Sequence, residues 1–124
     1  MGYDRKYLVW ALAYVVTGMG MGIYMAASHN HAQHVTHAHI LLVGFVASFI
    51  YAVIHKLWLG EKTSLLAKVQ LVIHQAGALT MFSGLFLLYG GLVPEEQIEP
   101  ILAPSTIVVF IAALLMIVMV LKKQ

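Results

Sequence analysis

Cysteine is absent from the 124-residue sequence, and charged side chains are scarce. A chain without cysteine forms no disulfide, thiolate metal site, iron–sulfur cluster or c-type haem attachment. Charged residues make up 10% of the chain, whereas soluble domains average about a quarter. Hydrophobic residues make up 61%. This balance excludes an ordinary water-soluble fold and indicates a membrane protein.

In place of charge, the sequence has four long apolar runs, at about 7–27, 37–58, 65–89 and 101–121. Each has the roughly 20 residues that are needed to cross the hydrocarbon core of a bilayer. The sequence therefore predicts an all-α integral membrane protein, a single domain over residues 1–124 with four transmembrane helices. The turn-rich segment 90–100 is expected to precede the last helix, with Pro104 in its first turn.

The basic residues predict how this bundle is oriented. With four spans, all of them fall on one side: Arg5, Lys6, Lys56, Lys62, Lys68, Lys122 and Lys123. Cytoplasmic loops are enriched in Lys and Arg, so we expect both termini in the cytoplasm and the protein in a bacterial-type inner membrane. Because these residues flank apolar runs and form no continuous face, we expect no nucleic-acid partner.

Histidine is the unusual residue here, with seven copies against five Asp and Glu together. Five lie at the outer end of the second span: His29, His31, His34, His37 and His39. Neutral imidazole is a ligand for zinc, copper, nickel and iron, so this segment is a candidate metal site. The alternative is that an exposed histidine-rich tract binds metal only incidentally.

The second span carries a small or polar stripe along its whole length. At about 100° per residue, His37, Gly44, Ser48, Tyr51 and His55 lie within roughly 40° of one line. His39 lies about 200° from His37, so the two rings are expected on opposite faces. Such a pair does not chelate one ion from one turn, but it serves two separate sites.

The third span carries His74, with Gln70, Gly77, Ala78 and Met81 on the same face. Ionisable residues inside a membrane are functional candidates by default, although a neutral histidine also serves as a hydrogen-bonding group between helices. His74 is about 22 Å deeper than the outer end of its helix, so we expect it near Tyr51 and His55 and away from His39. In the first span, Gly18, Gly22 and Ala26 predict a helix-packing seam, and the fourth span is expected to face lipid.

Residues 36–55, which begin Thr-His-Ala-His and contain Gly44-Phe45, resemble the haem-copper oxidase and nitric oxide reductase subunit I superfamily. The resemblance implies that His37 and His39 ligate haem on opposite faces of the helix. His74, as an ionisable residue within a span, is a further candidate cofactor ligand. Nearly the whole chain, including 18–29 and 66–77, is similar to small four-span oxidase-like membrane proteins. Because subunit I has 12 helices in three arcs of four, the resemblance also implies a homotrimer.

The chain departs from the oxidase pattern at the reaction centre. Oxidase chemistry requires a three-histidine copper or non-haem iron site, and one copy of this chain shows no second histidine pair to supply it. His55 also falls where the small relatives usually have an aromatic residue. Whether the protein is an enzyme therefore stays open, and reduction of oxygen or nitric oxide is not expected of this chain alone.

Three functions stay open from the sequence. The first is binding of haem b or a redox metal through His37, His39 and His74, for electron transfer to an unidentified redox partner or for redox sensing. The second is copper or zinc handling, with His34, His37, His39 and His55 as candidate ligands. The third is a structural or assembly subunit that has the oxidase-like architecture and no cofactor.

Overall fold

The structure is a computed structural model, which describes residues 1–60 and 64–122. Within these ranges the chain is all-helical, with four helical rods long and apolar enough to cross a membrane. The first rod is α1 (Tyr3–Ser28), the third is α4 (Leu65–Tyr89) and the fourth is α5 (Glu95–Lys122). The second rod, His34–Leu59, consists of α2 (His34–His39), η1 (Ile40–Val46), α3 (Ala47–Ile54) and η2 (His55–Leu59).

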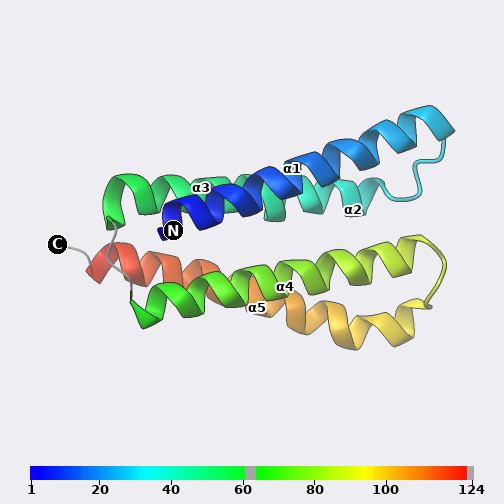
Figure 1. Cartoon of the computed structure of the whole chain (residues 1–124). Coiled ribbons are helices and arrows are strands. Elements are labelled where there is room, and N and C mark those ends of the chain that lie inside the picture. Colours follow the sequence, from blue (N-terminus) through cyan, green and yellow to red (C-terminus); the bar gives the residue numbers. More distant parts are fainter. Residues whose placement is uncertain (61–63, 123–124) are drawn as a thin grey trace.

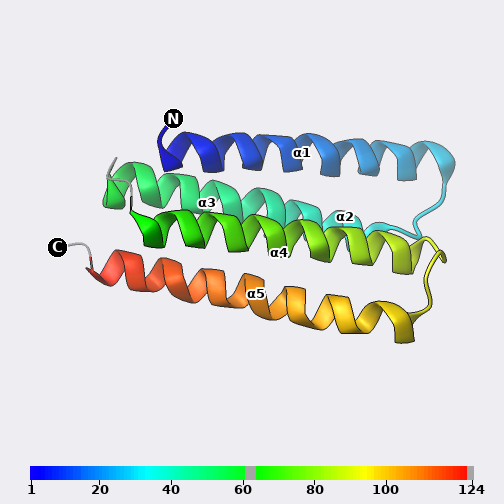
Figure 2. The same ribbon diagram turned by 60° about the horizontal axis from the view of Figure 1, so that its bottom comes forward.

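The four rods form two antiparallel hairpins (Figures 1 and 2). In one hairpin α1 packs along the second rod, and in the other α4 packs along α5. The start of α1, η2, the start of α4 and the end of α5 lie at one end of the bundle (Figure 1). The described basic residues gather at that end, whereas Lys62 and Lys123 lie outside the described residues. Which membrane face this end occupies stays a prediction.

The second rod is not a uniform α-helix, because η1 and η2 are wider π-helical segments. At the end of η1, the backbone N–H of Ala47 donates to the carbonyl oxygens of Leu42 and Gly44. In a regular α-helix that N–H would donate to Val43. Val43 therefore lacks its usual helical donor. Segments of π-helix are rare and occur frequently at functional sites.

The last helix begins at Glu95, so the prediction of a turn up to residue 100 with Pro104 in the first turn is wrong. Glu95 and Glu96 occupy the first turn, where carboxylates stabilise the positive end of the helix dipole. The carbonyl oxygen of Pro94 accepts from the N–H groups of Gln97 and Ile98. Pro100 and Pro104 consequently lie inside α5. The hydroxyls of Ser105 and Thr106, which follow Pro104, donate to the carbonyl oxygen of Leu102.

The glycine seam predicted in the first span is confirmed, and it joins parts of the same chain. A Cβ on Gly18 would clash with a methyl carbon of Leu41, and one on Gly22 would lie 3.1 Å from the ring of His37. These two glycines let α1 approach residues 37–41 of the second rod closely. They therefore face their own chain, and the third member of the series, Ala26, is exposed.

The fourth helix covers α4 and turns an apolar face outward, as the sequence predicts. Ala112, Met116 and Met119 are buried, whereas Ile107, Phe110 and Ile117 are more than half exposed. Exposed apolar side chains in a helix of this length fit contact with lipid or with another protein.

Candidate functional site

His37 and His39 point to different sides of their rod, as the sequence predicts. The Nδ1 of His37 donates to the carbonyl oxygen of Gly18 on α1, 2.8 Å away. The Nδ1 of His39 donates to the carbonyl oxygen of Val35 one turn earlier, also 2.8 Å away. A carbonyl oxygen only accepts, so in each neutral ring the proton sits on Nδ1 and Nε2 keeps its lone pair.

His39 lines a groove of about 500 Å³ between the second rod and the α4–α5 hairpin. The walls are mostly apolar and include Val43, Met81 and Phe110, with Glu99 as the acidic residue on the α5 side. Pockets that hold cofactors have volumes of roughly 300–1,000 Å³ and apolar walls with a few placed polar groups. The groove has these properties, and the imidazole of His39 is one of its polar lining groups.

The histidine-rich segment 29–39 does not assemble a metal centre in the described residues. His34 is exposed, and its Nδ1 donates to the carbonyl oxygen of His31, 3.0 Å away. His55 is near the far end of the same rod, about 30 Å from His34 along the helix axis. Across residues 1–60 and 64–122, no three His, Asp or Glu side chains come together to hold a metal ion. The four residues predicted as metal ligands are therefore spread over the rod: His34, His37, His39 and His55.

His74 is fully buried on α4 and reaches across to the π-helical segment η1. Its Nε2 donates to the carbonyl oxygen of Val43, 3.2 Å away. Its Nδ1 is buried and has no hydrogen-bond partner among the described residues. The ring meets Tyr51 edge-on, with 5.1 Å between ring centroids. This contact confirms the prediction that His74 lies at the depth of Tyr51.

His55 occupies an aromatic cluster at the end of the bundle that holds the chain termini. Its ring stacks against Tyr3 at 5.5 Å and against Tyr7 at 5.7 Å between centroids. Tyr7 also contacts His74, at 6.3 Å. His55 is 2% exposed, and its Nε2 has no hydrogen-bond partner in the described part of the chain. His55 and His74 thus form one inner cluster with three tyrosines, separate from the groove beside His39.

Two tyrosine–glutamine pairs, which sequence reasoning missed, tie the two hairpins together. The hydroxyl of Tyr7 donates to Oε1 of Gln70, whose Nε2 donates to the carbonyl oxygen of Ala112, 3.1 Å away. The hydroxyl of Tyr14 donates to Oε1 of Gln75 at 2.6 Å. Gln75 then donates to Ser48, 3.2 Å away.

The signal for these pairs was present in the sequence. Tyr7 and Tyr14 are two turns apart on one face of α1, and Gln70 and Gln75 are polar residues in an otherwise apolar span. The sequence did not indicate that side chains of α1 and α4 pair with one another, because these two helices are not consecutive in the chain.

The described side chains divide into two candidate sites. The outer site is the groove with His39, and its available ring nitrogen suits a metal ion or a haem iron. The inner site is the Tyr–His cluster with two unpartnered ring nitrogens. Both candidate sites are inferred from the geometry of this chain alone, because no family model, curated protein or solved structure matches it.

Proposed function

We propose that this chain is a membrane protein that binds haem b in the groove beside His39 and uses it for electron transfer or redox sensing. The observation that carries the proposal is the state of the His39 ring. Its Nδ1 is held by Val35, which leaves Nε2 with a lone pair in a mostly apolar groove. Histidines that ligate metals almost always donate the other ring N–H to a carboxylate, a backbone carbonyl or water.

The chemical types of the residues that line the groove suit a haem group. Apolar walls exclude water from an iron centre and so help to set its reduction potential. Met81 is on the wall of the same groove, and its thioether would be a candidate second ligand to the iron. When bound, the haem would supply one-electron chemistry. The protein's part is to hold the ring of His39 and to exclude water.

The resemblance to oxidase subunit I supports a wider assembly, which belongs to the same proposal. In this arrangement three copies form a 12-helix homotrimer in a bacterial-type inner membrane, with both termini in the cytoplasm. The apolar face of α5 that includes Phe110 supports contact with lipid or with a second copy. A cyclic trimer is a closed assembly, and closed point-group symmetry is the usual form of soluble homo-oligomers.

An optical spectrum of the detergent-purified full chain, recorded together with metal analysis, tests the proposal. We expect a Soret band on purification or after haem addition, with iron as the bound metal. The His39→Ala variant should lose it, and the matched control His29→Ala, which changes an exposed histidine in the first loop, should keep it.

Other results would overturn the proposal in distinguishable ways. Bound copper or zinc without iron would favour metal handling, and loss of that metal in His37→Ala would place it on the α1 side. No haem and no metal, together with an unchanged fold in both variants, would favour a structural or assembly subunit. A Soret band that survives His39→Ala would show that the haem is bound elsewhere.

A further inference from the structure

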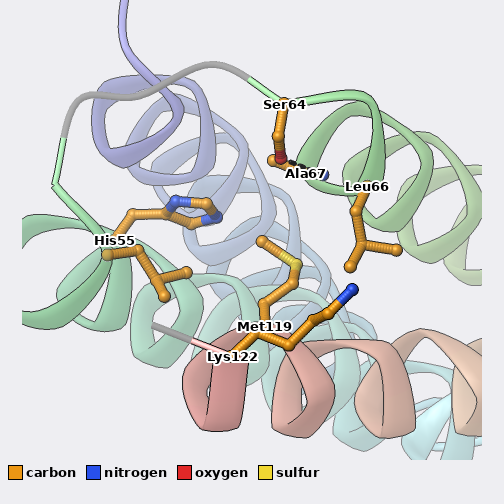
Figure 3. Close-up of a pocket in the computed structure, with 7 residues that line it drawn as sticks. His55, Ser64, Leu66, Ala67, Met119 and Lys122 are labelled. Atoms are coloured by element: carbon orange, nitrogen blue, oxygen red, sulfur yellow. Dashed lines mark hydrogen bonds between the residues drawn. The ribbon is translucent and has the colours of Figure 1, made fainter. Parts of the chain in front are cut away.

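A pocket of about 290 Å³ opens at the end of the bundle opposite the His39 groove. It lies where η2, the start of α4 and the end of α5 meet, and its wall includes Leu59. Leu66 and Met119 also line it (Figure 3). Its polar residues are His55, Ser64 and Lys122. The pocket therefore combines an apolar wall with hydrogen-bond donors and a positive charge.

Polar groups converge on this pocket. The first turn of α4, which includes Leu66 and Ala67, lines the pocket, and Ser64 caps it by accepting from the N–H of Ala67 at 3.0 Å. The ring of His55 points into the pocket (Figure 3), and its buried Nε2 has no hydrogen-bond partner among the described residues. Backbone N–H groups at the start of a helix favour an anion. An unpaired buried ring nitrogen there is costly unless a ligand satisfies it.

The described residues at this end of the bundle carry a net positive charge, which favours an anionic ligand. Among the described residues, one acidic side chain, Asp4, lies at this end, and the basic side chains there are Arg5, Lys6, Lys56, Lys68 and Lys122. If the four rods span a bilayer, this end lies at the level of the lipid headgroups. Basic pockets between transmembrane helices at that level bind anionic headgroups.

We propose that the pocket formed by His55, Lys122 and the start of α4 binds the phosphate group of an anionic phospholipid, whose acyl chain lies along Leu66 and Met119. The phosphate accepts from Lys122 and from N–H groups of the first turn of α4, and the His55 ring gains a polar partner. The proposal is independent of haem binding, because the His39 groove lies at the other end of the rods.

Native mass spectrometry of the full chain released from lipid nanodiscs tests this site. The nanodiscs contain phosphatidylcholine either alone or mixed with phosphatidylglycerol, and a parallel sample in detergent receives inorganic phosphate. We expect retention of phosphatidylglycerol over phosphatidylcholine. The Lys122→Gln variant should weaken it about fivefold, since one basic residue near a membrane surface contributes about 1 kcal/mol.

The matched control is Lys56→Gln, which removes an exposed basic residue at the same end that does not line the pocket. Retention should be unchanged in this variant. Equal losses in the two variants would overturn the proposal in favour of general surface attraction. Binding of inorganic phosphate as tightly as the lipid would overturn the lipid as the ligand, and no lipid preference would overturn the site. Because Lys122 is exposed, its substitution should leave the helical circular dichroism unchanged.

Discussion

The Nε2 of His74 donates a hydrogen bond to the carbonyl oxygen of Val43, 3.2 Å away, and this bond joins α4 to η1. The relationship depends on the π-helical backbone, because the N–H of Ala47 bypasses Val43 and donates to Leu42 and Gly44. A buried histidine and an under-used backbone carbonyl thus satisfy one another. The bond also fixes the ring, whose other nitrogen is buried without a partner among the described residues.

Replacing His74 with Phe should destabilise the chain by about 1 kcal/mol, the usual size of a hydrogen bond between membrane helices. The aromatic ring keeps most of the packing against Tyr51, but Val43 loses its donor. The free energy of unfolding can be measured by titrating the purified protein with dodecyl sulfate and following its circular dichroism. An unchanged or higher stability would show that the bond contributes nothing net.

Replacing Tyr14 with Phe should cost a similar amount, about 1 kcal/mol, because Gln75 keeps a buried oxygen without its donor. The same titration measures the effect. Tyr24→Phe is the matched control, since Tyr24 is 59% exposed on the same helix, and it should leave stability unchanged. If Tyr14→Phe and Tyr24→Phe behave alike, the Tyr14–Gln75 bond does not hold the hairpins together.

Replacing Gly44 with Ala should destabilise the chain by about 1–3 kcal/mol through overpacking. The added Cβ would lie 2.7 Å from the ring of Tyr14, which is itself held by Gln75. Gly20→Ala is the control, because a Cβ there meets nothing within 4 Å, and alanine favours a helix over glycine. Thermal unfolding in detergent should separate the two variants. A Gly44→Ala variant as stable as Gly20→Ala would contradict the close approach of α1 and η1.

The predicted orientation can be tested by labelling, because the native sequence contains no cysteine to give a background signal. In intact cells, a membrane-impermeant maleimide should label Asn30→Cys, which lies in the exposed first loop. It should label Lys56→Cys, at the opposite end of the second rod, only after the cells are permeabilised. The reverse pattern would place the termini outside and refute the positive-inside prediction.

The parts of the fold that follow from local periodicity were predictable. Helical spacing alone placed His37 and His39 on different sides and put Gln70 and His74 on one buried face. The start of α5 was not predictable from Pro104, because two glutamates and the carbonyl of Pro94 begin the helix earlier than the prolines suggest.

Relationships between non-consecutive helices were beyond sequence reasoning. The pairing of Tyr14 with Gln75 depends on how the two hairpins dock, and no single span encodes that docking. The π-helical turn at η1 likewise has no residue signature, since its sequence is an ordinary apolar run. The groove beside His39 appears only when α4 and α5 are placed against the second rod.

The π-helical segment η1 determines which way the outer histidines face. Each residue of a helix turns the chain by about 100°, so deleting one residue between 40 and 46 would rotate everything before it by about that angle relative to α3. His37 would leave its place between Gly18 and Gly22, and His39 would leave the groove. A change in chain length at η1, with every histidine retained, would therefore disable the outer site as fully as replacing His39.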